Sequence, residues 1–362
     1  MVFERFIFFL LLLLMPVLNI KGIDNALVLK KELILGKKND IIFSNRILLD
    51  TNNDKQIFVA DQLQLKIYIF DSKGLLTYTL GGKGRGPGEF ENMSSMNVYG
   101  QKVTVLDMIL KRITIFYFNK KTVRIETINL KNNHSSHYPS GMWALPDGSY
   151  LIKESIAYSN DSNIKNNYKE ILAVYNHDGS PVKDSILSFD AADIFKKRIN
   201  GEVVIAPLPF GAKPIIQIYN NHIYYGRTNT QIIKILSMNG KVLQKISLPV
   251  SPAPVTKEDL RNKLAPYENS LHYALIQYGI PSTWPLYDNL LIDNTGKIWI
   301  SENTINPKNY KWIIIDNDGN VIATISADKK IKIKSIQDNH VYAKTTSGSG
   351  ETEIAVYKVM GY

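Results

Sequence analysis

Hydrophobic and polar residues follow the same local pattern six times along the chain. In each copy a tight polar turn leads at once into a strand of alternating apolar residues, as in DTNNDKQIFVAD from Asp50 to Asp61. The first strand residues of the six copies are Ile57, Val103, Tyr150, Ile223, Ile298 and Val341. Their separations of 46, 47, 73, 75 and 43 residues indicate a unit of about 45 residues, with about 30 residues inserted in two of the intervals.

Each of the first five units contains a second turn followed by a further strand. In four of them the turn carries a glycine, which supplies the positive-φ position of a short hairpin turn, at Gly74, Gly179, Gly240 and Gly319. The count is therefore four strands per unit. Six four-stranded units of this length predict an all-β fold, a six-bladed β-propeller whose blades stand around a central tunnel.

The two ends of the chain predict how this ring closes. The sixth unit offers only three strands before Tyr362, whereas Ala26–Leu35 (ALVLKKELIL) is strand-like and belongs to no unit. We therefore expect this segment to pair with the last blade, so that one propeller domain runs over residues 24–362. Closure of this kind removes the exposed sheet edge, and we expect a monomer.

Residues 1–22 differ from the rest of the chain. Phe6–Leu18 is an apolar run behind Arg5 that is short for a transmembrane helix and of the right length for the core of a secretory signal. No A-x-A cleavage pattern follows, so the segment is expected to be a signal peptide or an uncleaved N-terminal anchor. No second apolar run of membrane length follows it. We expect an exported protein that is periplasmic, at the cell surface or secreted.

The amino-acid composition excludes several kinds of functional site. The 362 residues are 44% hydrophobic and include no cysteine, which excludes disulfides, thiolate metal sites and a cysteine nucleophile. The formal net charge of +10 permits acidic partners. Basic pairs such as Lys30-Lys31 and Lys329-Lys330 are dispersed over several units, which is typical of a solvated surface. We therefore expect no nucleic-acid partner.

The long insertions all fall on one face of the predicted ring. In a propeller, turns joining strands one to two and three to four lie on one face, and the remaining links lie on the other. By this rule residues 154–169, 190–214 and 249–285 share one face, which we call the insertion face; the opposite, short-turn face has only tight turns. Long loops on a rigid scaffold usually carry binding sites, so we expect the site on the insertion face.

The insertion at residues 249–285 contains the one helix signal of the chain. Thr256 is a candidate N-cap with Asp259 three residues later, and an apolar stripe that ends at Gly279 follows. Its aromatic residues either line a pocket, with the insertion as a lid, or attach the insertion to the blades. The candidate ligand contacts are Arg85, Arg227, His272, Tyr278 and Trp284.

The glycine-rich stretch GGKGRGPGEF, from Gly81 to Phe90, is not expected to bind phosphate as a P-loop. It lacks the Lys-Ser/Thr pair and leads into no helix. We interpret it as a link between the first two blades, in which Phe90 fills the seam and Glu89 is available to Arg85. Arg85 is then a candidate contact for an anionic group, because this link also lies on the insertion face.

The stretch from Ile57 to Phe90 (IFVADQLQLKIYIFDSKGLLTYTLGGKGRGPGEF) resembles a repeat of the NHL type, as found in exported bacterial six-bladed propellers. The second unit departs from that repeat, with Asn119 to Lys121 where the turn glycine would sit. The resemblance implies a six-bladed propeller in a mostly non-catalytic superfamily and implies no substrate.

Some six-bladed propellers of this kind are calcium-dependent, which makes acidic residues at the tunnel mouth candidate ligands. Asp61, Asp107 and Glu302 each end a second strand and would lie on the insertion face; the alternative is that each holds its own loop by accepting backbone amides. No GxSxG or HExxH sequence occurs, and His134 and His137 form at most half of a zinc site.

These observations favour a non-enzymatic binding or scaffold propeller with no cofactor. Its expected partner is a protein, peptide or glycan of the cell envelope. The alternative function is a calcium-dependent hydrolase of the lactonase or esterase type, or a lyase, because ligands drawn from six distant blades would leave no linear motif.

Overall fold

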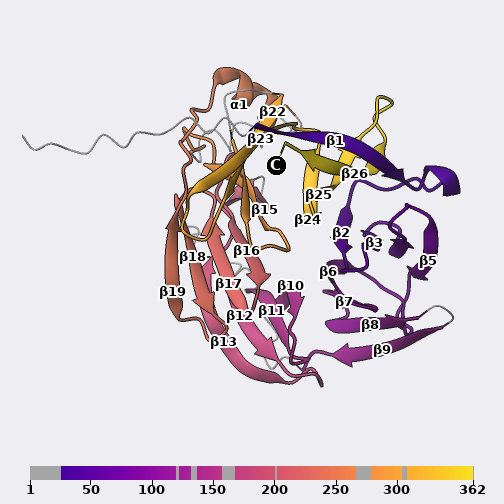
Figure 1. Cartoon of the computed structure of the whole chain (residues 1–362). Coiled ribbons are helices and arrows are strands. Elements are labelled where there is room, and N and C mark those ends of the chain that lie inside the picture. Colours follow the sequence, from indigo (N-terminus) through magenta and orange to yellow (C-terminus); the bar gives the residue numbers. More distant parts are fainter. Residues whose placement is uncertain are drawn as a thin grey trace, which may run out of the picture.

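The computed structural model of the chain describes residues 26–119, 122–131, 137–156, 168–199, 202–265, 279–303 and 308–361. Its strands form a ring of sheets around a central axis (Figure 1), which confirms the predicted all-β, six-bladed β-propeller. Residues 1–22, expected to be a signal peptide or anchor, lie outside the described residues. No helix in the described ranges is long and apolar enough to cross a membrane.

Each blade is a four-stranded antiparallel sheet. In the first three blades the strands follow chain order: β2 (Ile47–Thr51), β3 (Ile57–Asp61), β4 (Lys66–Phe70) and β5 (Leu76–Gly81); β6 (Met93–Tyr99), β7 (Lys102–Asp107), β8 (Arg112–Phe118) and β9 (Val123–Asn129); β10 (His137–Ala144), β11 (Tyr150–Ile156), β12 (Lys169–Tyr175) and β13 (Pro181–Asp190).

The fourth and fifth blades follow the same order: β16 (Pro214–Tyr219), β17 (His222–Arg227), β18 (Ile232–Ser237) and β19 (Val242–Ser247); β20 (Tyr287–Ile292), β21 (Ile298–Glu302), β22 (Asn309–Ile315) and β23 (Val321–Asp328). The sixth blade is β24 (Lys332–Gln337), β25 (His340–Thr346), β26 (Thr352–Met360) and β1 (Ala26–Leu35). All six strand starts read from the repeat lie in the second strand of a blade.

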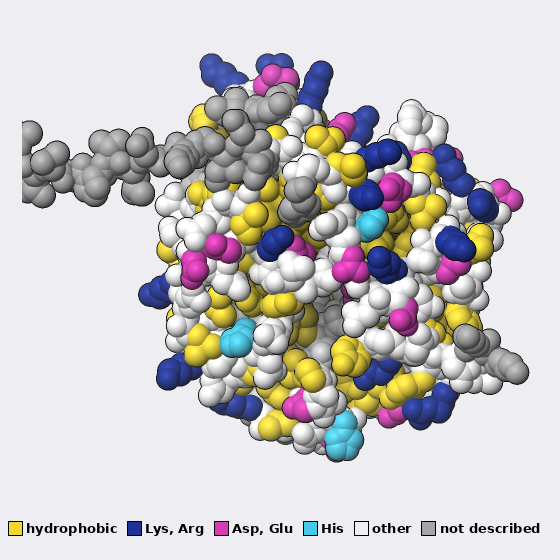
Figure 2. All heavy atoms as spheres, viewed as in Figure 1, with side chains coloured by type: hydrophobic (Ala, Val, Ile, Leu, Met, Phe, Trp, Pro, Cys, Tyr) yellow, Lys and Arg dark blue, Asp and Glu magenta, His cyan; other side chains and the backbone are white. Residues whose placement is uncertain are grey.

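The middle strands are apolar because neighbouring blades cover both of their faces. Every residue of β3 (IFVAD) is buried, whereas the outer strand β5 alternates between partly buried and exposed residues. Six hydrophobic clusters each fill the seam between two adjacent blades. Each blade thus buries both faces against its neighbours, and Figure 2 shows the hollow left at the centre of the ring.

Polar side chains also join the inner strands. The Asp50 Oδ2 atom on β2 accepts the backbone N–H of Val98 on β6 at 3.0 Å. In the other direction the Thr51 hydroxyl donates to Gln337 Oε1 on β24 at 2.6 Å. These bonds fix the first blade against both of its neighbours around the tunnel.

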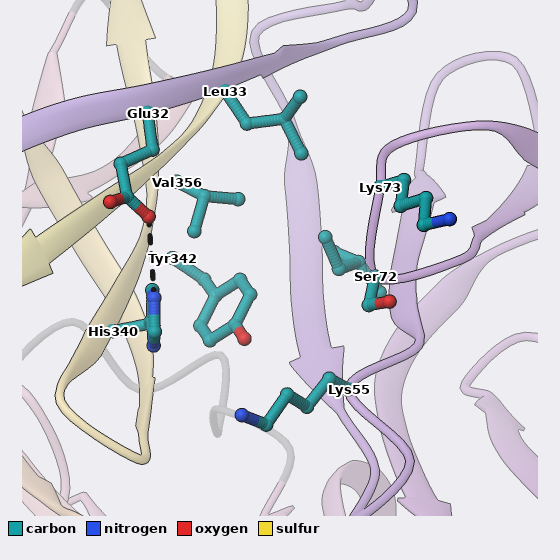
Figure 3. A pocket seen from close by; sticks show the side chains of 9 residues that line it. Glu32, Leu33, Lys55, Ser72, Lys73, His340, Tyr342 and Val356 are labelled. Carbon is teal, nitrogen blue, oxygen red and sulfur yellow. Dashed lines mark ion pairs between the residues drawn. The ribbon is translucent and has the colours of Figure 1, made fainter.

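The predicted closure is confirmed over the predicted residues. β1 pairs with β26 from Val28 opposite Met360 to Leu35 opposite Ile354, with one irregularity between Lys31 and Leu33. Beyond the prediction, Ala26 and Leu27 also pair in parallel with β23, which joins the last two blades in one eight-stranded sheet. At the seam of the sixth and first blades, on the short-turn face, the Glu32 carboxylate contacts His340 Nε2 at 3.3 Å (Figure 3).

Two insertions carry secondary structure of their own. The helix predicted after Thr256 is α1 (Lys257–Leu264), and its capping box is present: Thr256 Oγ1 accepts the N–H of Asp259, whose carboxylate accepts the N–H of Thr256. The insertion at residues 190–214 forms a hairpin that we did not predict, β14 (Ile194–Ile199) with β15 (Glu202–Pro207).

The turn glycines have the positive φ that the repeat predicted. At Gly179 the φ angle is 81°, and a Cβ atom placed there would lie 2.2 Å from the carbonyl oxygen of Asn129 in the preceding blade. Glycine is therefore required at this turn both by the backbone conformation and by the close approach of the neighbouring blade.

Candidate functional site

Two insertions meet on the insertion face and enclose the largest of the cavities described here. Its volume is about 630 Å³, and its walls come from residues 207–213 of one insertion, from Lys263 and Trp284 of the other, and from blades four to six. A second cavity of about 350 Å³ shares Lys213, Asp288, Tyr310 and Lys332 with it. The two cavities therefore adjoin.

Six lysines line these two cavities, which we together call the lysine site: Lys213, Lys263, Lys329, Lys332, Lys334 and Lys344. Among the described residues that line either cavity, Asp288 is the only acidic one. Asp288 lies near the start of β20 and Lys332 at the start of β24, both inner strands, while Lys213 directly precedes the inner strand β16. The lysine site thus lies at the insertion-face end of the tunnel, beside blades four, five and six.

Asp288 and Tyr310 form the polar centre of the lysine site. Lys213 Nζ lies 3.1 Å from Asp288 Oδ1, and the Tyr310 hydroxyl donates to Asp288 Oδ2 at 3.2 Å. Lys332 Nζ in turn donates to the Tyr310 oxygen at 3.0 Å. Both carboxylate oxygens are therefore engaged, and Asp288 orients Lys213 directly and Lys332 through Tyr310.

The pKa values show that positive charge is in excess here. Burial alone would raise the pKa of Asp288, but Lys213, Lys332 and the Tyr310 hydroxyl lower it below its usual value. Burial, together with Lys329, Lys344 and Lys213, lowers the pKa of Lys332 although Asp288 opposes this. Burial, together with Lys344, Lys213 and Lys332, likewise lowers the pKa of the Lys334 ammonium. An anionic group entering the lysine site would relieve this repulsion.

Aromatic rings support the ammonium groups. Lys332 Nζ lies 4.6 Å from the centre of the Tyr310 ring, and Lys329 Nζ lies 5.4 Å from the same ring and 5.8 Å from that of Trp284. Such contacts favour the protonated amine and fix its position. Lys329 and Lys332 are thus held by the protein before any ligand arrives.

Trp284, a predicted ligand contact, combines the two roles weighed for the aromatic residues of its insertion. Its indole N–H donates to Asp259 at 3.2 Å, which ties it to α1, and its ring meets that of Phe210 edge-on at 4.7 Å. It also lines the larger cavity and is only partly buried. Trp284 therefore attaches one insertion to the other and remains available to a ligand.

Arg227, also a predicted ligand contact, holds an insertion in place. Its guanidinium donates to the carbonyl oxygens of Asp190 and Ala191 and lies 2.6 Å from Asp193 Oδ1. It is not among the residues that line the lysine site, although the next residue, Thr228, is. The structure thus gives Arg227 a positioning role, and contact with a ligand stays a prediction.

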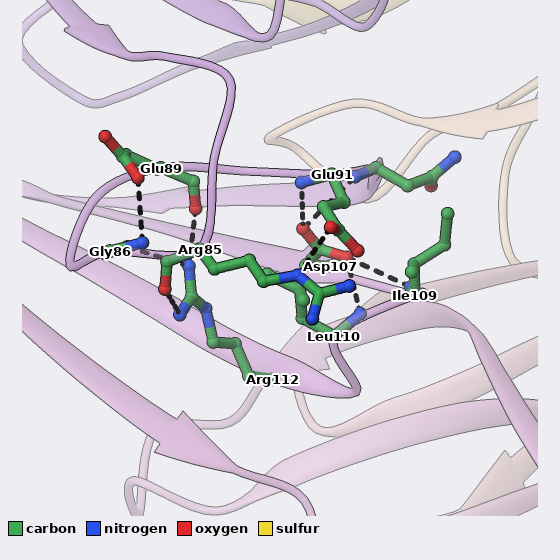
Figure 4. A network of polar contacts seen from close by, with 9 residues as sticks. Arg85, Gly86, Glu89, Glu91, Asp107, Ile109, Leu110 and Arg112 are labelled. Carbon is green, nitrogen blue, oxygen red and sulfur yellow. Dashed lines mark hydrogen bonds and ion pairs between the residues drawn. The ribbon is translucent and has the colours of Figure 1, made fainter.

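Arg85 lies in the glycine-rich link of the first two blades, apart from the lysine site (Figure 4). It pairs with Glu91 Oε1 at 2.6 Å and not with Glu89, whose carboxylate instead accepts the N–H of Gly86. Our expectation of an Arg85–Glu89 pair was wrong, because Glu89 folds back within its own turn. Arg85 remains largely exposed, so binding of an anion there stays a prediction.

The other two predictions for this link, that Phe90 fills the seam and that no helix follows, are confirmed. Phe90 is fully buried in the seam of blades one and two, and a strand, not a helix, follows the link. The Arg112 guanidinium, on β8, holds the link in place by donating to the carbonyl oxygens of Arg85, Gly86 and Glu89.

The three candidate metal ligands stay in separate blades. The Asp61 carboxylate accepts the N–H groups of Ser44, Leu63 and Gln64. Asp107 does the same for the four N–H groups of Glu91, Asn92, Ile109 and Leu110 (Figure 4). Glu302 contacts Lys311 and the N–H of Ser251. In the described part of the chain no three acidic or histidine residues cluster as metal ligands would.

The histidine candidates add little to the site. His272 and Tyr278, both predicted ligand contacts, lie outside the described residues, as does His134. His137 contacts the Glu154 carboxylate at 2.9 Å through Nδ1.

A separate cavity of about 210 Å³ lies on the short-turn face, at the seam of the sixth and first blades. Glu32, His340 and Lys55 are among the residues that line it (Figure 3).

Comparison with known proteins supports the propeller. Residues 37–194, which span the first three blades, match the model of the family DUF5128, described as a 6-bladed beta-propeller. A Bacteroides fragilis protein described as exported is 16% identical, with a TM-score of 0.54 over 93% of this chain and 95% of its own. A member of the DUF4221 family from Bacteroides vulgatus is 10% identical, with a TM-score of 0.53 over 93% and 99%.

A streptogramin B lyase is 14% identical, with a TM-score of 0.45 over 92% of this chain and 97% of its own. No curated protein matches the chain. At their low identities the two Bacteroides structures indicate a shared fold alone, and the NHL assignment stays a prediction.

Proposed function

We propose that the protein is an exported, non-enzymatic binding propeller that holds an anionic ligand in the lysine site. The observation that carries this proposal is the charge of that site, where the described lining residues include six lysines and one acidic residue, Asp288, whose oxygens are both engaged. Export is supported by the apolar run Phe6–Leu18. Placement at the mouth of a rigid tunnel between two long insertions is typical of a binding site.

The calcium-dependent alternative draws no support from its candidate ligands. The carboxylates of Asp61 and Asp107 are fully buried and accept several backbone N–H groups each, so they stabilise their own loops. In the lysine site, the surplus of ammonium groups would repel a divalent cation.

The experiment is isothermal titration calorimetry with dextran sulfate as the anionic probe and neutral dextran as its control. We expect binding of dextran sulfate alone, weakened by added salt because exposed charges are screened. The double variant Lys332→Ala/Lys334→Ala should lower the affinity about tenfold or more, since each lost charge contact contributes about 1 kcal/mol.

The matched control is Lys241→Ala/Lys245→Ala, which removes the same charge from exposed positions of the fourth blade. We expect this control to bind like the unaltered protein. Equal weakening in both double variants would mean that net charge alone attracts the probe, and would contradict the proposal.

A further inference from the structure

We propose that the anionic ligand is an acidic oligosaccharide, a chain of sugar rings that carries carboxylate groups at intervals. This inference rests on the proposed function and names the ligand class of the same site. It draws on three features of the lysine site: the spread of its charges, its surplus of hydrogen-bond donors, and the accessible ring of Trp284.

The lysines are distributed along the lysine site instead of converging on one point. Lys263 and Lys329 line only the larger cavity, and Lys334 and Lys344 only the smaller one, while Lys213 and Lys332 line both. A third cavity of about 340 Å³ continues past Lys213 and Asp288 toward the third blade. This arrangement fits an extended ligand with several separated anionic groups better than one compact anion.

The charged groups that line the lysine site are mostly donors, because each of its six ammonium groups donates hydrogen bonds and accepts none. The Ser301 and Thr228 hydroxyls accept the N–H groups of Asn289 and Lys213, and both residues are buried, so they stabilise the walls of the site. The ammonium groups favour a ligand rich in oxygen acceptors.

This surplus of donors disfavours an acidic peptide, the other common polyanion outside the cytoplasm. A peptide brings one backbone N–H per residue, and each N–H needs an acceptor when it leaves water. Asp288 already accepts from Lys213 and Tyr310. Ring and glycosidic oxygens only accept hydrogen bonds, and a sugar hydroxyl can accept while its own proton rotates toward solvent, so an oligosaccharide suits these walls better.

Trp284 supplies a surface for a sugar ring. It is partly exposed in the larger cavity, which Lys263 and Lys329 also line, and its orientation is fixed by Asp259 and Phe210. An indole offers a flat apolar face with a polar edge, which suits a ring that has C–H groups on one side and hydroxyls at its rim. A carboxylate on that ring would then lie near the two lysines.

The test compares three hexameric probes by isothermal titration calorimetry: oligogalacturonate, neutral maltohexaose and hexaglutamate, which matches the charge of the first. We expect oligogalacturonate to bind at least about tenfold more tightly than either of the others. Trp284→Ala should lower that affinity about tenfold, an effect typical of an aromatic contact, while Trp284→Phe should retain most of it. Unchanged urea unfolding would show that both variants keep the blades folded.

Each result has a definite meaning. Tighter binding of hexaglutamate, with no effect of Trp284→Ala, would overturn the oligosaccharide inference and leave the anion-binding function standing. Equal binding of maltohexaose, unaffected by Lys332→Ala/Lys334→Ala, would overturn both. Failure of all three probes and of dextran sulfate to bind would also overturn both.

Discussion

At the scale of single residues, Asp288 sets the net charge of the lysine site. Asp288→Asn removes its one negative charge while the side chain can still accept a hydrogen bond from Lys213 or Tyr310. We expect the affinity for dextran sulfate to rise about two- to fivefold, equivalent to about 0.5–1 kcal/mol. The control is Asp178→Asn, which removes an acid paired with Lys131 on the short-turn face. A loss of affinity in Asp288→Asn would contradict this view.

Asp50 ties the first blade to the second, and it does so at a cost in stability. Burial raises the pKa of its carboxyl from 3.8 to about 6, although the N–H groups of Thr51 and Val98 lower it. The ionised form is therefore disfavoured in the folded protein, so stability falls as pH rises from 3.8 to about 6. We expect Asp50→Asn to raise the free energy of unfolding by about 1–3 kcal/mol at neutral pH.

Urea unfolding of both proteins at about pH 7 and about pH 3.5 checks the sign of this effect. The gain should be present at the higher pH and vanish at the lower one, where the carboxyl is protonated in both states. An equal loss of stability at both values would show that the carboxylate matters through its hydrogen bond to Val98 and not through its charge.

At the scale of elements, β1 closes the ring. Leu35 is 2% exposed in the seam of the sixth and first blades, whereas Val28, on the same strand, is 62% exposed. We expect Leu35→Ala to lower the free energy of unfolding by about 2–4 kcal/mol and Val28→Ala to change it by less than about 0.5 kcal/mol. Thermal or urea unfolding measures both, and equal effects would mean that β1 does not close the ring.

Asp259 links α1 to the lysine site. It completes the capping box with Thr256 and accepts the indole N–H of Trp284. Asp259→Ala should therefore weaken α1 and release Trp284, and we expect about a threefold to tenfold loss of oligogalacturonate affinity. Global unfolding in urea should change little, because α1 contributes no residue to the six blade seams. A large loss of global stability would instead make α1 part of the propeller core.

At the scale of the whole molecule, most of the fold could be predicted because each blade repeats one local pattern. Turns followed by apolar strands, from Ile57 to Val341, located all six second strands, and the missing strand of the last unit identified Ala26–Leu35 as the closing strand. The hairpin of β14 and β15 was missed, although Asn200-Gly201, a common two-residue hairpin turn sequence, stands between its strands.

The lysine site could not be predicted from a repeated sequence pattern. Lys213, Asp288 and Lys332 are separated by 75 and 44 residues in the chain and meet only because three inner strands begin at the same end of the tunnel. Each is an isolated residue in an ordinary strand or, for Lys213, directly before one, and the pair Lys329-Lys330 was interpreted as solvated surface. The parity of propeller links did place the insertions on the face where this site lies, and the structure puts Trp284, a predicted ligand contact, in one of its walls.

The most direct test of the central claim is a crystal structure of the protein with bound oligogalacturonate. We predict carboxylates of the ligand against Lys332 and Lys334 at the insertion-face end of the tunnel, and a sugar ring against Trp284. Ligand bound instead on the short-turn face, in the seam cavity beside Glu32 and His340, would contradict the account.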